Sequence, residues 1–200
     1  MVQVVLVRHG ETEWSRDLRH TGRTDVPLTD RGREEARMLR DALAGSSFTR
    51  VFTSPLSRAV ETCRLAGLGE RAERVDPLLE WDYGDYEGIT TKEIRAGRPG
   101  WFLWRDGCPG GETADQVGAR VDPLVAELKA SKGEVALFAH GHVLRVLTAR
   151  WLGLPPGDGA LFALSTATLS MLGFERETAV IRRWNAPVAH AGAAPSASPA

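Results

Sequence analysis

Residues 4–12 read V-V-L-V-R-H-G-E-T, and this stretch decides the fold. Its apolar part is a short continuous run rich in valine, which predicts a strand over residues 3–7 that is buried on both faces of a sheet. The run ends abruptly at Arg8 and His9. Both side chains avoid burial unless they are paired, so their position at the end of a buried strand indicates a site.

Strands and helices alternate along the rest of the chain. The expected elements are, in order, a helix capped by Thr29 and stopped at Gly45, a strand over residues 50–53, a helix capped by Ser54 with Pro55 in its first turn, a strand over residues 134–139, a helix from Gly141, and a strand pair over residues 161–174 and 178–184. This alternation predicts an α/β fold, a three-layer α/β/α sandwich with a mainly parallel central sheet. We expect one domain over residues 1–185. Residues 186–200 have no core-forming periodicity and predict a disordered tail.

The bulk composition is that of an ordinary globular protein, with 42% hydrophobic residues, 26% charged residues and a net charge of −1. This balance argues against nucleic-acid and membrane-surface partners, which call for a marked basic excess. Cys63 and Cys108 are too few for a disulfide framework and lack metal-binding spacing, which fits a reducing cytosol. The first segment has no basic n-region and its apolar run is too short to span a membrane, so we expect a cytoplasmic protein.

A histidine also follows the third expected strand, in the motif H-G-H at residues 140–142. Ligands of an open α/β sheet bind at the carboxyl ends of its strands, so His9 and His140 are expected at one edge. A helix that begins after His140 aims free N–H groups and its positive dipole end there. Arg58, in the first turn of the helix after the second strand, approaches the same edge. Two arginines, two histidines and a helix N-terminus indicate a phosphate site, because guanidinium groups pair with phosphoryl oxygens.

Five stretches occur in a familiar order. They are L-V-R-H-G-E-T at residues 6–12, H-T-G at 20–22, T-S-P-L-S-R-A at 53–59, Glu80, and A-H-G-H at 139–142. Together they resemble the histidine phosphatase (phosphoglycerate-mutase-like) superfamily, branch 1, over nearly the whole chain except the tail. Residues 79–88, L-E-W-D-Y-G-D-Y-E-G, and residues 104–108, W-R-D-G-C, are similar to a narrower branch with broad acid phosphatases and the fungal-type sedoheptulose-1,7-bisphosphatase. The resemblance implies the phosphoglycerate-mutase-like form of the α/β/α fold.

The resemblance also implies a role for each matching residue. His9 would be the nucleophile and form a phosphohistidine, with its attacking nitrogen neutral and its other ring N–H held by an acceptor. Arg8, Arg58 and His140 would hold the phosphoryl oxygens, with His140 protonated, so that one histidine titrates high and the other low. Glu80 would protonate the leaving alkoxide and then activate water. The residues expected on the phosphate or substrate side are Ser15, Thr21, Gly22, Tyr83, Arg105, Gly141 and His142.

The leading interpretation is a metal-independent phosphomonoesterase for small phosphorylated metabolites, without a cofactor. Sugar phosphates or bisphosphates and broad acid phosphatase activity are both open, and so is a homodimer. The first rival is a cofactor-dependent phosphoglycerate mutase, which uses the same His9 chemistry but returns the phosphoryl group to substrate. The segment between Gly88 and Gly111 is compact, and its only cations are Lys92, Arg95, Arg98 and Arg105. That composition favours hydrolysis.

Three further alternatives follow from the same residues. A phosphoprotein phosphatase would use the same chemistry, but the Trp- and Tyr-rich stretches suggest a partly covered pocket. A non-catalytic phosphate-binding module would most simply have lost the nucleophile or a phosphate-holding residue, and all of these are present. His140 and His142 have a spacing that zinc ligands use, but no third ligand is evident nearby and an arginine-rich pocket repels cations.

Overall fold

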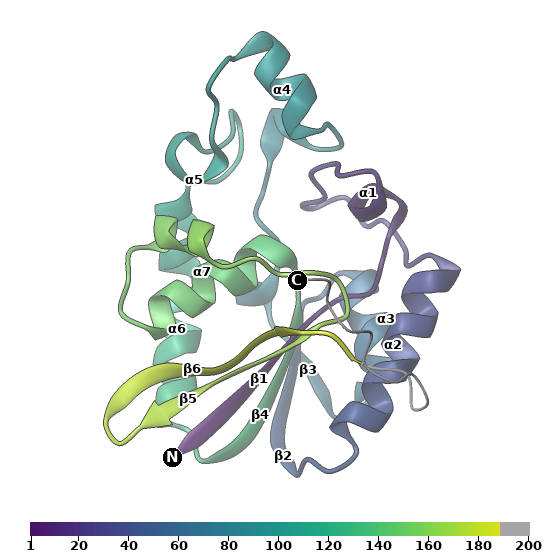
Figure 1. The fold of residues 1–200 in the computed structure, drawn as a ribbon, viewed down its shortest axis with the longest axis vertical. Coiled ribbons are helices and arrows are strands. Elements are labelled where there is room, and N and C mark those ends of the chain that lie inside the picture. Colours follow the sequence, from purple (N-terminus) through teal and green to yellow (C-terminus); the bar gives the residue numbers. More distant parts are fainter. Residues whose placement is uncertain (189–200) are drawn as a thin grey trace, which may run out of the picture.

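Within residues 1–188, which the computed structural model describes, six strands form one sheet (Figure 1). The strands are β1 (Val2–Arg8), β2 (Phe48–Thr53), β3 (Ala72–Arg74), β4 (Gly133–Ala139), β5 (Leu169–Glu175) and β6 (Thr178–Ala186). Their order is β3-β2-β4-β1-β5-β6. The first four strands in this order are parallel, whereas β5 is antiparallel to both β1 and β6. The prediction of a mainly parallel central sheet is confirmed.

Helices cover both faces of this sheet and complete the three layers (Figure 1). The α-helices are α1 (Glu13–Arg16), α2 (Asp30–Leu43), α3 (Ser57–Leu65), α4 (Thr91–Gly97), α5 (Leu103–Asp106), α6 (Ala114–Ala130) and α7 (Gly141–Trp151); short 3₁₀-helices span Gly69–Arg71, Asp76–Leu78, Gly84–Tyr86 and Pro156–Leu161. Successive side chains of β1 point to opposite faces. Val4 and Leu6 therefore pack in the cluster that contains α6 and α7, and Val5 and Val7 in the cluster that contains α2 and α3.

Two local predictions are wrong, and a contact with a distant residue explains the first. Ser54 does not cap α3, which begins at Ser57 with Leu56 as its N-cap; the Ser54 hydroxyl instead contacts His140. Leu161 ends a 3₁₀-helix, and the strand expected from this residue begins only at Leu169. Thr29, by contrast, caps α2 as predicted, because its side chain accepts the backbone N–H of Gly32.

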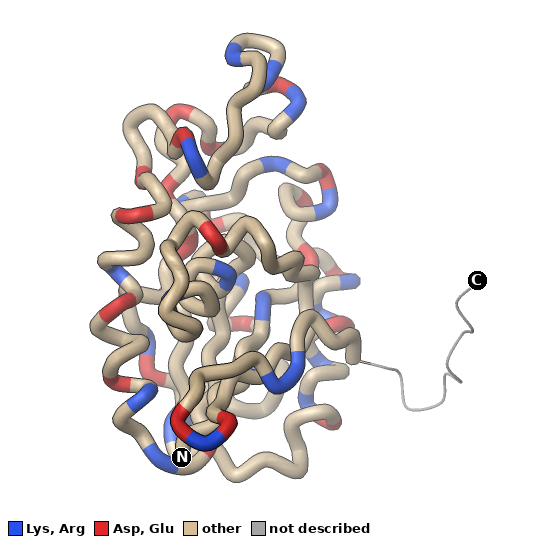
Figure 2. The backbone as a smooth tube through the Cα atoms, turned by 60° about the vertical axis from the view of Figure 1, so that its left-hand side comes forward, with Lys and Arg blue, Asp and Glu red and all other residues tan. Residues whose placement is uncertain are grey.

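The segment between β3 and α6 carries α4 and α5, which lie beyond the carboxyl ends of β1 and β4 (Figure 1). Basic and acidic residues are interspersed and do not gather at one end of the molecule (Figure 2). No helix in residues 1–188 is both long and apolar enough for a membrane span. Strand β6 reaches Ala186, one residue into the predicted tail, and the tail from residue 189 onward lies outside the described residues.

Candidate active site

Two histidines lie side by side at the carboxyl ends of adjacent parallel strands. Arg8 at the end of β1 is in register with Ala139 at the end of β4, so His9 and His140 are the first residues after the two strands. The backbone N–H of His9 donates to the carbonyl of Ala139 at 3.0 Å and extends the ladder by one step. The imidazole rings are 5.1 Å apart between their centroids. The sheet itself therefore sets the spacing of the pair.

The ring of His9 is held in one tautomer. Its Nδ1 lies 2.7 Å from the carbonyl oxygen of Gly10, and because a carbonyl only accepts, Nδ1 donates and Nε2 keeps its lone pair. Gly10 packs directly on the Gly32 backbone, so that a Cβ on Gly10 would lie only 2.2 Å from the carbonyl oxygen of Gly32. Burial, and then the charges of Arg58 and Arg8, hold the pKa of His9 well below its ordinary value. Nε2 is therefore unprotonated at neutral pH, as a nucleophile requires.

His140 is fixed between an arginine and a serine. Arg58 Nε donates to its Nδ1 at 3.1 Å, so Nε2 carries the proton and donates to the Ser54 hydroxyl at 2.7 Å. Burial, followed by the charge of Arg58, lowers the pKa of His140 well below its ordinary value. The expectation that one of the two histidines titrates high is therefore wrong. Both pKa values are lowered, because His9 and His140 share the same buried, cationic surroundings.

Two arginines supply positive charge beside the histidines. Arg58, at the start of α3, is fully buried, and its Nη atoms donate to three backbone carbonyls of the 21–24 loop. Arg8 donates through Nη1 to the carbonyl of Leu164, whereas its Nε is buried without a hydrogen-bond partner in the described part of the chain. A buried N–H without an acceptor is rare in folded proteins, and an anion in the site would satisfy it.

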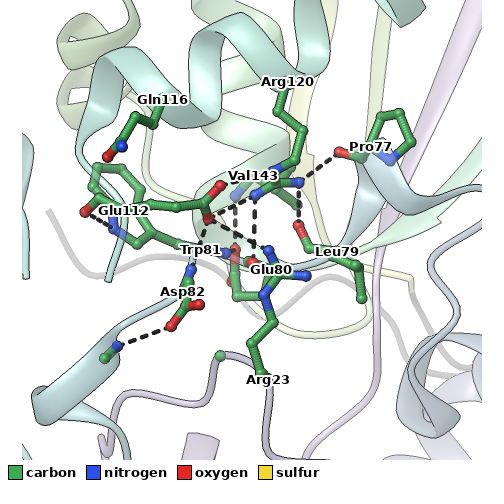
Figure 3. Close-up of polar contacts among 12 residues, drawn as sticks. Arg23, Pro77, Leu79, Glu80, Trp81, Asp82, Glu112, Gln116, Arg120 and Val143 are labelled. Atoms are coloured by element: carbon green, nitrogen blue, oxygen red, sulfur yellow. Dashed lines mark hydrogen bonds and ion pairs between the residues drawn. The ribbon is translucent and has the colours of Figure 1, made fainter. Parts of the chain in front are cut away.

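The Glu80 carboxylate joins its own loop to the N-terminus of α7 (Figure 3). Oε1 accepts the backbone N–H of Val143 at 2.8 Å and that of Trp81 at 2.9 Å, and Oε2 accepts the N–H of His142 at 3.0 Å. The first N–H groups of a helix have no partner within the helix, and a carboxylate is favoured there by the helix dipole. The carboxylate is thus fixed within the first turn of the helix that begins after His140.

These groups open into one cavity of about 1040 Å³. The predicted site residues that line it are Arg8, His9, Ser15, Thr21, Glu80, Tyr83, Gly141 and His142. Arg58 and His140 are fully buried and do not themselves line the cavity. Much of the remaining wall is apolar and includes Trp101, Phe102 and Trp104. In residues 1–188, no three His, Cys, Asp or Glu side chains gather in a way that could hold a metal ion.

Two residues expected on the substrate side lie elsewhere. The Arg105 side chain is 65% exposed, pairs with the adjacent Asp106 at 2.7 Å, and does not line the cavity. Gly22 is buried and does not line the cavity; its N–H donates to Glu87 at 2.8 Å and its carbonyl accepts from Arg58. Gly22 therefore supports Arg58 without contributing to the cavity wall.

Several residues of the site escaped the sequence analysis. Arg145 lines the cavity, stacks on Trp104 with 4.5 Å to the ring centroid, and donates to the carbonyls of residues 159 and 160. Its place on α7, three residues after His142, is a helical spacing that could have revealed it. Ser54 lies in the motif at residues 53–59 but was predicted only as a helix cap, and the ion pair between Glu112 and Arg120 behind Glu80 had no local signal.

An α/β/α sandwich that brings two histidines and two arginines to the carboxyl ends of β1 and β4 defines a phosphoglycerate-mutase-like protein. The chain belongs to the histidine phosphatase superfamily (branch 1), whose family model matches residues 4–187. The motif resemblance and the fold class drawn from the sequence are confirmed.

Individual relatives agree with this assignment. An acid phosphatase of Mycobacterium tuberculosis is 42% identical over 186 residues, which cover 90% of this chain and 91% of that protein. The sedoheptulose 1,7-bisphosphatase of Saccharomyces cerevisiae is 40% identical, over 75% of this chain and 67% of that protein. A solved structure of a Mycobacterium tuberculosis open reading frame superposes with a TM-score of 0.88 at 40% identity, covering 94% of this chain and 98% of that chain. Phosphoglycerate mutases are also among the relatives.

Proposed function

We propose that this protein is a metal-independent phosphomonoesterase that hydrolyses small phosphorylated metabolites, sugar phosphates or bisphosphates among them, through a phosphohistidine on His9. The observation that carries the proposal is the tautomer of His9. With Nδ1–H on the carbonyl of Gly10, an unprotonated Nε2 is available in a cavity beside two guanidinium groups. A neutral nitrogen next to concentrated positive charge suits attack on a phosphate ester.

In the first step His9 Nε2 attacks phosphorus while the bond from phosphorus to the ester oxygen breaks. The unpartnered Nε of Arg8 and the buried guanidinium of Arg58 stabilise the negative charge on the phosphoryl oxygens. Arg58 Nε donates to His140 Nδ1 at 3.1 Å, which fixes the guanidinium charge behind the His9 ring.

Glu80 transfers a proton in each of the two steps, formation and hydrolysis of the phosphohistidine. Its carboxyl group gives a proton to the leaving ester oxygen, and the alcohol departs. The resulting carboxylate then accepts a proton from the water that attacks phosphohistidine, which releases inorganic phosphate and restores His9. The guanidinium groups supply the positive charge that a metal ion supplies in many other phosphatases.

The cations of the cavity bear on the choice between hydrolysis and mutase activity. A mutase has to retain a bisphosphorylated intermediate, for which extra cations in the pocket are useful. Of the four cations between residues 88 and 111, Arg98 and Arg105 do not line the cavity, which supports hydrolysis, whereas Lys92 and Arg95 line it together with Arg19 and Arg145. Because phosphoglycerate mutases occur among the relatives, the mutase reaction belongs in the test.

The cavity has room for a leaving group larger than the phosphoryl group and offers it a neutral hydrogen-bond donor. Tyr83 lies 2.6 Å from His142 Nδ1, and burial, followed by the charge of Glu80, raises the pKa of Tyr83 well above its ordinary value. The phenol therefore stays protonated and donates, which leaves an N–H on His142 Nε2. Because His142 lines the cavity, this neutral donor suits an oxygen of the leaving group.

The test is turnover by purified protein. We expect wild type to hydrolyse p-nitrophenyl phosphate with EDTA present and His9→Ala, at unchanged melting temperature, to lose the activity. Acid-labile, base-stable phosphate should be trapped on His9 during turnover. A screen by kcat/KM with sedoheptulose 1,7-bisphosphate, fructose 1,6-bisphosphate and 3-phosphoglycerate, the last also with 2,3-bisphosphoglycerate, ranks substrates and detects mutase activity. Full activity in His9→Ala would refute the mechanism, and so would loss of wild-type activity in the presence of EDTA.

A further inference from the structure

We propose that Arg120, held by Glu112, is a positioning residue for Glu80 and that the proton transfer to the leaving group depends on it. The proposal rests on the proposed function, because it concerns the acid of the same reaction. Neither Arg120 nor Glu112 lines the cavity, so each acts on catalysis only through other residues, and the backbone that both bind carries Glu80. Both side chains are mostly buried, with exposed fractions of 18% for Arg120 and 17% for Glu112.

Arg120 projects from α6 onto the backbone on the N-terminal side of Glu80 (Figure 3). Its Nη1 donates to the carbonyls of Pro77 and Leu79, both at 2.9 Å, and its Nη2 lies 3.4 Å from the carbonyl of Glu80 itself. One guanidinium group thus fixes three carbonyls within four consecutive residues. A lysine could not reproduce this, because an ammonium is a point charge without the planar fork of donors.

Glu112 fixes the backbone on the other side of Glu80. Its carboxylate takes Arg120 in two contacts, Nε at 2.9 Å and Nη2 at 3.0 Å, and also accepts the N–H of Asp82 at 2.8 Å. Its carbonyl accepts the indole N–H of Trp81 at 2.9 Å, and its own N–H donates to the carbonyl of Asp82 at 2.8 Å. The ion pair and the Glu112 backbone therefore hold residues 77–82 from both sides (Figure 3).

The Glu80 carboxylate is fixed separately, by the first turn of α7. Its position relative to His9 Nε2 thus depends on two anchors, one for the backbone and one for the carboxylate. A proton transfer tolerates little error, since a misplacement of about 1 Å can cost about 100-fold in rate. If Arg120 is removed, α7 can still bind the carboxylate, but the backbone that carries it loses three hydrogen bonds.

The leaving group separates positioning of the acid from a general loss of structure. An alkoxide needs a proton as it departs, whereas p-nitrophenolate is a weak base and departs without one. The ratio kcat/KM reports only steps up to departure of the leaving group, so the later role of Glu80 toward water does not enter. We expect Arg120→Met to lower kcat/KM for fructose 1,6-bisphosphate by about 30- to 100-fold, and that for p-nitrophenyl phosphate by less than about threefold.

Two further variants complete the design. In a Glu80→Gln background, Arg120→Met should change kcat/KM for the sugar phosphate by less than about threefold, because effects that pass through one residue do not add. The matched control is Arg150→Met, since Arg150 forms a two-contact pair with Asp122 at 2.7 and 3.1 Å and does not line the cavity. It should lower stability without any dependence on the leaving group. If Arg120→Met does not fold, Arg120→Lys replaces it, with the same pattern expected because the charge remains but the fork is lost.

Three results would overturn the positioning role, and a fourth would overturn the proposed function. Equal losses of Arg120→Met with both substrates, or the same loss in the Glu80→Gln background as in wild type, would overturn the positioning role. A leaving-group-dependent loss in Arg150→Met would overturn it as well, because that variant does not touch Glu80. If fructose 1,6-bisphosphate is not a substrate, the sugar phosphate with the highest kcat/KM in the screen takes its place. Failure of the proposed function looks different, since wild type would then hydrolyse neither a sugar phosphate nor p-nitrophenyl phosphate.

Discussion

The two buried site histidines should make the folded protein less stable in mild acid. His9 and His140 are 4% and 0% exposed, and burial is the main reason that both pKa values lie well below the ordinary one. In the unfolded chain each ring titrates near its ordinary pKa of about 6.5. Below that pH, down to the lowered folded-state pKa, the unfolded chain binds protons that the folded protein does not. The free energy of unfolding therefore increases with pH in this window and is lost as the pH falls.

The size of the effect follows from the number of buried rings. Each histidine that stays neutral in the folded state contributes a slope of at most about 1.4 kcal/mol per pH unit, so His9 and His140 together contribute at most about 3 kcal/mol per pH unit. His142, whose pKa is also lowered well below its ordinary value by burial and then by Arg145, adds to the slope in the same direction. Carboxylates contribute little above about pH 5.5, because their ordinary pKa values lie near 4.

Urea unfolding measured in steps from about pH 7.5 to pH 5.5 at constant ionic strength tests this prediction. The buffer must lack phosphate, because an anion bound only to the folded protein would raise its apparent stability. The matched variant is His9→Asn with His140→Gln, which places neutral amides near the bonded ring nitrogens. It should lose the part of the slope that His9 and His140 contribute, whereas the part from His142 and from His20, whose pKa burial also lowers, remains. A flat profile in wild type, or an unchanged slope in the double variant, would contradict the burial argument.

Three further predictions concern single residues. Ser54→Ala leaves the Nε2–H of His140 buried without an acceptor and should lower the free energy of unfolding by about 1–3 kcal/mol in a urea titration; an unchanged midpoint would contradict the assigned tautomer. Gly141→Ala would place a Cβ 3.3 Å from Cζ of Arg8, so the displaced guanidinium should raise KM for p-nitrophenyl phosphate by about tenfold; an unchanged KM would mean that Arg8 tolerates the shift. Arg105→Ala should leave KM for sugar phosphates within about twofold, because a surface side chain paired with Asp106 contributes little to the site; a large rise would return Arg105 to the substrate side.

The parts of the site that the sequence predicted are those whose signal lies in neighbouring residues. Arg8 and His9 follow one buried strand, and His140 follows another, so the general rule for open sheets was enough to bring them to one edge. Pairing of β1 with β4 in register then makes the two histidines neighbours. The cap at Thr29 was found for the same reason, since its partner is only three residues away.

The errors arise where a distant residue changes the local preference. Ser54 precedes Pro55 and looks like a helix cap, but its hydroxyl is taken by His140, 86 residues further along the chain. Arg105 lies in a motif of the resembling branch, yet an adjacent carboxylate holds its side chain at the surface. The pKa of His140 was misjudged because burial, and then the charge of Arg58, lowers it, and the complete burial of the ring follows from packing that the sequence does not show.

The Glu112–Arg120 pair marks the limit of local reasoning most clearly. On its own, the sequence shows a glutamate before a helix and an arginine within it, which is the pattern of ordinary surface charge. The role of the pair depends on the backbone carbonyls of residues 77, 79 and 80, which accept hydrogen bonds from Arg120. Buried carbonyls that no sheet or helix pairs need such a donor. A loop that places an acid near the substrate is not helix or strand throughout. Its backbone carbonyls therefore need hydrogen-bond donors from other parts of the chain. Here Arg120, a mostly buried arginine on α6, supplies the hydrogen-bond donors. We therefore expect positioning residues of catalytic loops to be found from the backbone groups that they pair and not from sequence motifs.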